Sequence, residues 1–210
     1  MILSTALTLI YTAPWMQFLV IGLAALAGYL VFDEADNIAH SPFSRGLNKS
    51  YGAICLFTLL TLLLLLPFLS KALNNHTLTQ FDHFFRTGSM VFGGGHVVLP
   101  LLQSEVVNPG WVTQDQFLAG YGIAQAVPGP LFSFAAYLGA ISPLNENPLF
   151  SGLICLVAIF LPSYLLIIGV LPFWESLRKK SAVKKSMRAV NSAVVGLLLA
   201  ALYRPVWTSA

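Results

Sequence analysis

Charged side chains are scarce in this sequence. Only 9% of its 210 residues are Asp, Glu, Lys or Arg, whereas a soluble domain carries about a quarter. So few charges cannot cover the water-facing surface of a chain this long, which excludes a soluble enzyme and leaves no basis for a nucleic-acid partner. Hydrophobic residues make up 57% of the chain, and this composition is typical of an integral membrane protein.

Patterns for disulfides, metals and catalysis are also lacking. The two cysteines, Cys55 and Cys155, lie in apolar runs and fit small packing residues better than a disulfide or a zinc site. Asp82–His83 has no partner at metal-ligand spacing, so we expect no metal and no cofactor. Neither GxSxG nor HExxH occurs, so we expect no enzyme; an intramembrane hydrolase would need Ser133 as nucleophile and His96 as base.

Long hydrophobic runs, in contrast, are abundant. A membrane-spanning helix needs about 20 mostly apolar residues. The predicted membrane segments are Pro14–Phe32, Tyr51–Ser70, Phe81–Gln103, Phe117–Ile141, Leu149–Trp174 and Ala189–Trp207. The predicted fold class is therefore an all-α polytopic membrane protein with about six membrane segments. Two of them, the third and the fourth, are interrupted by Gly and Pro and either cross the membrane or turn back as hairpins.

Basic side chains are concentrated in one stretch. Arg178–Arg188 holds six of the eleven Lys and Arg residues. The positive-inside rule predicts that this loop faces the cytoplasm, and we interpret it as a topology anchor rather than a ligand site. If every segment crosses once, both chain ends lie outside, which suggests that something precedes Met1. The apolar run Met1–Ile10 is then the end of an earlier membrane helix or a linker.

Two glycine- and proline-rich breaks divide the third and fourth segments. They read FGGGH at Phe92–His96 and AVPGP at Ala126–Pro130. Non-helical backbone at membrane depth is tolerated only where it is buried in protein or lines a watery cavity. A pair of such breaks therefore indicates a transporter's binding site. Helices restarting at His96–Leu102 and at Pro130 would present unpaired N–H donors and partial positive charge, which suits an anion.

The candidate binding residues lie in and around these breaks. Glycines would offer backbone N–H groups, prolines would interrupt the helix, and polar side chains would donate hydrogen bonds. The predicted substrate-binding residues are Arg86, Gly93, Gly94, Gly95, His96, Gln125, Pro128, Gly129, Pro130 and Ser133. Three alternatives stay open: the breaks are packing features, His96 is a helix cap, and Arg86 is an interfacial arginine rather than a charge at the site entrance.

The charge available at these breaks is small. Two helix N-termini together offer about one unit of positive charge, which is too little for a dianion at the bilayer midplane. We therefore expect this chain to supply half a site, with a homologous half or a second subunit supplying the rest, most simply in a dimer. Glu105 and Asp115, which flank Trp111, are expected in an interfacial loop with a structural role.

Four stretches carry the motifs of a known family. They are FGGGHVVLPLLQSEVV at Phe92–Val107, GWVTQDQFLAGYGIAQAVPGPLFSFAAYLG at Gly110–Gly139, VAIFLPSYLL at Val157–Leu166 and NSAVVGLLLAALYRPVWTSA at Asn191–Ala210. Together they closely resemble the chromate ion transporter family. The resemblance divides the chain into linking transmembrane helices at 1–80 and a repeat domain at 81–210. The chain is similar to the second half of the family's long members. Those members continue beyond the position that matches Ala210, so we expect this chain to be a fragment.

The resemblance implies a function as well as a fold. It implies efflux of chromate across the inner (plasma) membrane, coupled to an ion gradient or to exchange with another oxyanion such as sulfate. The implied partners are a chromate- or sulfate-like oxyanion, the lipid bilayer and the homologous half or second subunit. Two alternatives remain, namely a sulfate-type uptake carrier and a membrane assembly subunit that transports nothing.

Overall fold

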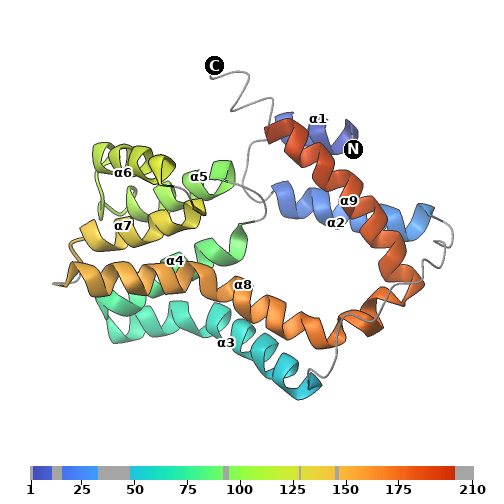
Figure 1. Ribbon diagram of the computed structural model, residues 1–210, viewed down its shortest axis with the longest axis horizontal. Coiled ribbons are helices and arrows are strands. Elements are labelled where there is room, and N and C mark those ends of the chain that lie inside the picture. The colour runs from blue at the N-terminus through green and yellow to red at the C-terminus, as the bar shows by residue number, and fades with distance from the viewer. Residues whose placement is uncertain are drawn as a thin grey trace. The chain divides into compact units, whose positions relative to one another are not determined.

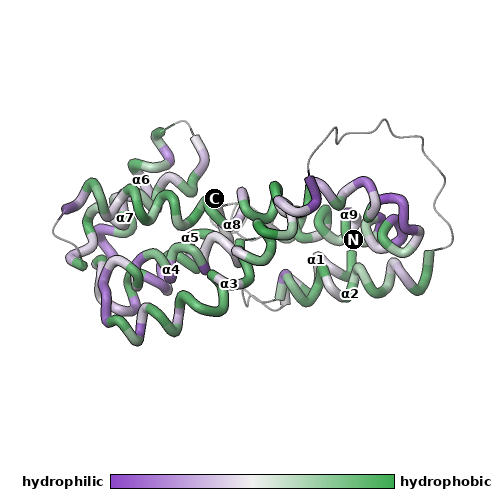
Figure 2. Tube along the Cα trace, turned by 90° about the horizontal axis from the view of Figure 1, so that it is seen from below, coloured by the Kyte–Doolittle hydropathy of each residue, from purple (hydrophilic) through white to green (hydrophobic). Residues whose placement is uncertain are grey.

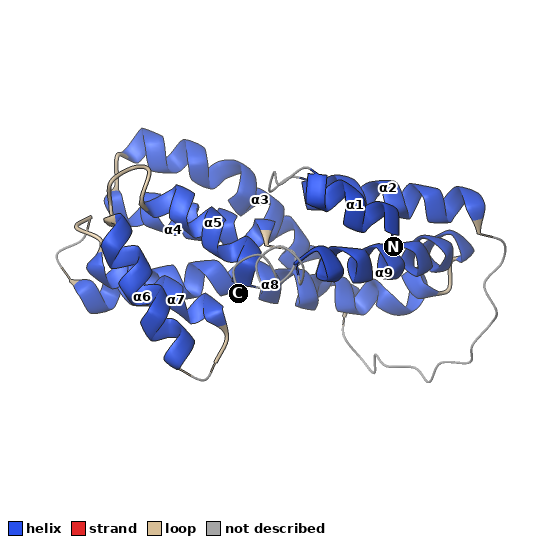
Figure 3. Cartoon of the chain, turned by 90° about the horizontal axis from the view of Figure 1, so that it is seen from above, coloured by secondary structure: helices blue, strands red, loops and turns tan. Residues whose placement is uncertain are grey.

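The fold is all-α. The computed structural model describes residues 2–10, 16–32, 48–91, 95–127, 129–144 and 147–201, and every regular element in these ranges is a helix (Figures 1 and 3). The elements are α1 (Ile2–Ile10), α2 (Met16–Val31), α3 (Lys49–Leu73), α4 (His76–Met90), α5 (Gly95–Val106), α6 (Gln114–Ala126), the 3₁₀ turn η1 (Leu131–Ser133), α7 (Phe134–Ile141), α8 (Pro148–Arg178) and α9 (Ser181–Ala201). The predicted all-α class is therefore confirmed.

Two of the described helices, α3 and α8, are long and apolar enough to cross a membrane. They correspond to the predicted segments Tyr51–Ser70 and Leu149–Trp174. The helix α2 and the stretch Leu131–Ile141 are apolar but shorter. The third and fourth predicted segments each form two helices separated by a break, as expected. A total of about six membrane crossings stays a prediction.

Local sequence signals set several helix ends. Asn74 ends α3 in the left-handed conformation, with φ of 48°, and Asn75 caps α4 by accepting hydrogen bonds from the N–H groups of Thr77 and Leu78. Thr113 opens α6 with a reciprocal capping box shared with Gln116. Short polar residues therefore set the end of α3 and satisfy otherwise unpaired backbone N–H groups at the starts of α4 and α6.

The described residues form two compact units. The terminal unit comes from residues 1–47 and 171–210, and the central unit from residues 48–170. The domain boundary predicted near residue 80 rests on motifs and stays a prediction.

The terminal unit is built from α1, α2 and α9, with α2 and α9 packed side by side. A methyl group at Gly28 on α2 would lie 2.6 Å from Ala189 Cβ on α9, so the two helices approach closely through small residues. The prediction of a basic loop at Arg178–Arg188 is wrong for most of its length, because α9 begins at Ser181. Hydrophilic residues instead occupy the first turns of that helix (Figure 2).

The central unit has a continuous apolar core. Its largest fully buried side chains include Phe84 and Phe85 from α4, Leu102 from α5, and Phe134 and Leu138 from α7. The helices on either side of both breaks thus pack into this core, together with residues of α3 and α8.

Small residues bring the helices of the central unit close to α8. A Cβ at Gly88 on α4 would lie 2.1 Å from the backbone oxygen of Ile159 on α8. A Cβ at Gly152 on α8 would lie 2.8 Å from the backbone oxygen of Ala136 on α7. Gly139 on α7 packs in turn against α8. Membrane helices associate through such small residues because lipid offers no hydrophobic drive for helix pairing.

One buried hydroxyl joins three of these helices. Ser151 on α8 is fully buried, and its Oγ lies 2.8 Å from Gln80 Oε1 on α4 and 2.7 Å from the backbone oxygen of Gly139 on α7. Away from water, these acceptors have lost their solvent partners, so the hydroxyl stabilises the three-helix contact.

Ser151→Ala is expected to lower the free energy of unfolding by about 1–2 kcal/mol, because two buried oxygens lose their hydroxyl contact. The measurement is thermal unfolding of the purified protein in detergent. Ser163→Ala is the matched control, since Ser163 lies exposed on the same helix. Equal melting temperatures for the two variants would contradict the assigned role of Ser151.

Candidate functional site

The first break lies between α4 and α5. Helix α4 ends at Met90, and its C-cap Val91 is extended, with φ of −84° and ψ of 110°. Helix α5 begins at Gly95, one residue before the predicted restart. Gly93 and Gly94 lie outside the described residues, and His96 is described only by its backbone position in the first turn of α5. The helix break is confirmed, and the glycine cradle stays a prediction.

The second break lies between α6 and α7. Helix α6 ends at Ala126, and Pro130 caps the 3₁₀ turn η1, which leads directly into α7. The prediction that a helix restarts at Pro130 is confirmed, with a tighter first turn that closes when the N–H of Ser133 donates to the Pro130 oxygen at 3.0 Å. Pro128 lies outside the described residues. Gly129 has open space where a Cβ would sit.

The remaining predicted side chains at the second break are exposed. The structure places Gln125, Gly129, Pro130 and Ser133 in one exposed stretch of chain. Gln125 Nε2 donates a hydrogen bond to the Tyr121 hydroxyl one helical turn earlier. Polar groups therefore do gather at this break, and their contact with a substrate stays a prediction.

Arg86 is held in an ion pair. Its Nε lies 2.8 Å from Oδ1 of Asp82, one turn earlier on α4, and the Asp82 side chain is only 8% exposed. The helical spacing of four residues could have predicted this pair from the sequence. Because Arg86 neutralises a nearly buried carboxylate, it stabilises the folded protein. Its role at the entrance of a site stays a prediction, and in that role Arg86 would remain paired with Asp82.

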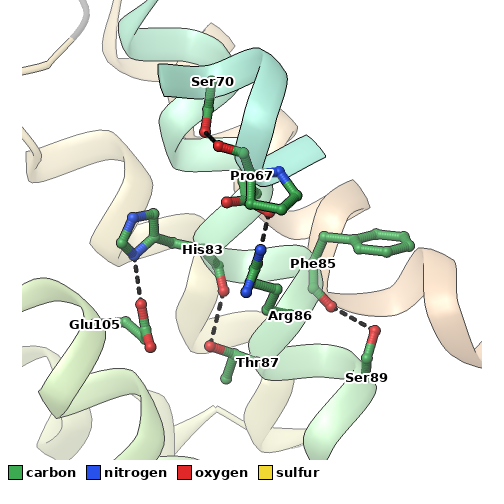
Figure 4. Close-up of polar contacts among 9 residues, drawn as sticks. Pro67, Ser70, His83, Phe85, Arg86, Thr87, Ser89 and Glu105 are labelled. Carbon is green, nitrogen blue, oxygen red and sulfur yellow. Dashed lines mark hydrogen bonds and ion pairs between the residues drawn. The ribbon is translucent and has the colours of Figure 1, made fainter. Parts of the chain in front are cut away.

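A second polar contact between side chains joins α4 to α5. His83 Nδ1 contacts Glu105 Oε2, and Figure 4 shows the two side chains pointing toward one another from their separate helices. The prediction that Glu105 lies in an interfacial loop is wrong, because it lies on α5 next to a histidine. Asp115 is also helical, in the first turn of α6, and is exposed. His83 and Glu105 lie 22 positions apart in the sequence, so no local pattern could have predicted their contact.

Trp111 completes this cluster. Its ring meets the His83 ring edge-on, with 4.8 Å between centroids and 61° between planes. Gly110, with φ of +79°, turns the chain after α5, and the N–H of Trp111 donates to the Val106 oxygen at 2.9 Å. This is a Schellman turn, which needs a residue that tolerates the left-handed conformation. The turn thus holds Trp111 against His83.

The charged side chains of α4 and α5 contact one another within the part of these helices that the structure describes. Asp82 is paired with Arg86, and His83 with Glu105. Arg86 is therefore already paired, and an anion at the break would not meet it as a free cation.

Comparison with known proteins identifies relatives of this chain. The family model described as chromate transporter matches residues 78–210. A chromate transport protein of Pseudomonas aeruginosa is 26% identical over 113 residues, which cover 54% of this chain and 26% of that protein. A chromate transport protein of Cupriavidus metallidurans is 29% identical over 130 residues, covering 60% of this chain and 31% of the relative.

Shorter relatives also match. The uncharacterized transporter YwrA of Bacillus subtilis is 33% identical over 121 residues, which cover 57% of this chain and 66% of that protein. The aligned residues span only about a quarter to a third of the longer relatives. No solved structure matches the chain. Since the family match covers well over half of the sequence and takes in both helix breaks, the chain belongs to the chromate transporter family.

Proposed function

We propose that this chain forms half of a membrane transport site for a tetrahedral oxyanion, with chromate as the principal substrate. The observation that carries the proposal is the pair of helix breaks, each followed by a restarted helix, at Gly95 and at Pro130. Both restarts expose N–H donors at the positive end of a helix dipole. Chromate as the substrate is taken from the names of the relatives.

The second half of the site comes from a homologous half or a second subunit. Each restarted helix offers about half a unit of positive charge, and Arg86 is already paired with Asp82. A dianion therefore needs a matching set of donors from elsewhere, and two pseudo-equivalent halves that rock against each other would give alternating access. The protein would act in the inner (plasma) membrane, with efflux driven by an ion gradient or by exchange with another oxyanion.

Gly129→Ala in the full-length protein tests this site. Its Cβ would meet no atom within 4 Å, so we expect normal folding. We expect export to fall by about tenfold, which corresponds to about 1.4 kcal/mol, because the methyl group would keep an anion away from the backbone. The measurements are chromate accumulation in cells and the amount of protein in the membrane. Gly122→Ala on α6 is the control, since its Cβ also meets open space.

The alternatives give different results in the same cells. Full export by the Gly129 variant would mean that the second break is not part of the site. Net sulfate entry without chromate export would indicate an uptake carrier. No flux of either anion, with partner proteins lost from the membrane on deletion, would indicate an assembly subunit.

A further inference from the structure

His83 and Glu105 connect the two helices that flank the FGGGH break. Each residue lies more than two helical turns from the break, His83 before it on α4 and Glu105 after it on α5. The contact therefore joins the two helices at a distance from the break. A change in this contact would be transmitted to the break through the two helices.

The surroundings leave His83 and Glu105 to interact chiefly with each other. The other charges in the same part of α4, Asp82 and Arg86, are joined to each other. Each member of the His83–Glu105 pair is about one third exposed, at 33% and 35%, so the pair is not sealed in the protein interior. Trp111 covers one edge of the imidazole.

Charged groups on the elements around α4 are few. Helix α3 carries Lys49 and Lys71 near its two ends, and the start of α6 carries the exposed Asp115. Helix α8 carries Glu175 and Arg178, which form an ion pair with each other near its C-terminus. Within the described part of these helices, Glu105 is the group in ionic contact with His83.

A histidine and a carboxylate in contact can bind and release one proton. Histidine is the side chain that ordinarily gains and loses a proton near neutral pH. With the proton, an imidazolium faces a carboxylate and the two helices are held by an ion pair. When the proton leaves to water, a neutral imidazole faces the carboxylate, and only a hydrogen bond remains. Proton binding would thus change how firmly the two helices that flank the break, α4 and α5, are held together.

We propose that His83 and Glu105 form a proton-binding site that couples proton movement to oxyanion transport. The proposal rests on the oxyanion transport function proposed above and names the coupling ion. His83 lies within the predicted membrane segment Phe81–Gln103, and Glu105 lies two residues beyond its end. Ionisable groups within membrane segments commonly mark ion pathways and proton relays. The coupling would act through the strength of the α4–α5 contact, and the site would take up one proton and release it in each cycle.

The first test does not depend on transport. When every other tryptophan of the full-length protein, including Trp15, Trp174 and Trp207, is replaced by Phe, the fluorescence of Trp111 reports on the neighbouring imidazole. We expect the fluorescence of the purified full-length protein to titrate with pH, and we expect His83→Gln to abolish this titration. His76→Gln, an exposed histidine in the first turn of the same helix, should leave it unchanged. A titration that survives in the His83 variant would overturn the proposal.

The second test separates coupling from transport. Vesicles containing the full-length protein are assayed for chromate exchange at equal pH and for net chromate flux driven by a pH gradient. We expect His83→Gln and Glu105→Gln to keep exchange within about twofold and to lose net pH-driven flux by at least about tenfold. His76→Gln should keep both fluxes.

The remaining outcomes are also decisive. Unchanged pH-driven flux in the His83 variant, or equal loss of both fluxes in a protein with the wild-type melting temperature, would overturn proton coupling. Wild-type exchange without any pH-driven flux would overturn it too, while leaving oxyanion transport standing. Absence of both fluxes in the wild type would reject the transport function, and the Trp111 titration would still decide whether the pair binds a proton.

Discussion

Gly88→Ala is expected to prevent the protein from accumulating in folded form. The added methyl group would lie 2.1 Å from the backbone oxygen, 2.8 Å from the carbonyl carbon and 3.0 Å from the Cα of Ile159. All three are backbone atoms, so no side-chain rotation can relieve the clash. Helices α4 and α8 would have to separate, at a cost of about 3 kcal/mol or more, which is a large share of a typical stability.

The measurement for this variant is the amount of monodisperse protein recovered after extraction into detergent. Gly22→Ala and Gly122→Ala are matched controls, because neither added Cβ meets another atom within 4 Å. We expect both controls to accumulate like the wild type. Recovery of the Gly88 variant at the level of the controls would show that α4 and α8 do not pack as closely as described.

Replacing Arg86 alone is expected to be nearly as damaging. Arg86→Gln leaves the nearly buried Asp82 carboxylate without its ionic partner. Removing one member of a buried pair costs about 3–5 kcal/mol, and we expect about 3 kcal/mol here because the Arg86 side chain is 35% exposed. The measurement is the melting temperature of the purified protein.

A double variant separates this structural effect from a role in transport. Asp82→Asn combined with Arg86→Gln removes both charges and keeps two polar side chains that can still contact each other. We expect most of the lost stability to return. A double variant as unstable as Arg86→Gln would contradict the ion-pair explanation. A stable double variant that no longer exports chromate would assign Arg86 a second role, on the anion itself.

The helix breaks could be predicted from sequence because their cause is local. Glycine lowers the cost of leaving the helix, and proline removes an N–H donor and clashes with the preceding turn. Both effects act within a few residues. The ends of α4 and α6, at Met90 and Ala126, and the restart at Pro130 therefore fall where the composition indicates.

The basic stretch shows how polarity can mislead. The charge of Arg178–Arg188, which lies between two apolar runs, predicts a loop. From Ser181 onward, however, it contains neither Gly nor Pro, and Ala, Lys, Met and Arg are among the best helix formers. Helix propensity, rather than hydropathy, decides its backbone, and α9 begins within it.

The candidate proton site could not have been predicted from local pattern. His83 and Glu105 come together because α4 and α5 fold back on each other around a shared core that includes Phe84 and Leu102. Gly110 then sets the direction of the turn that holds Trp111. Such contacts depend on tertiary packing, which neither spacing nor composition encodes for residues this far apart.

The length of α8 has a consequence for the surrounding bilayer. With 31 residues at about 1.5 Å each, the helix is about 46 Å long, whereas the hydrocarbon layer is about 30 Å thick. Even at the largest tilts seen for membrane helices, about 40°, α8 would be too long to lie wholly within the hydrocarbon layer. Its final turn, where Arg178 Nη2 lies 2.7 Å from Glu175 Oε1, would therefore emerge among the lipid headgroups, and hydrophobic mismatch would make the depth of that turn respond to membrane thickness.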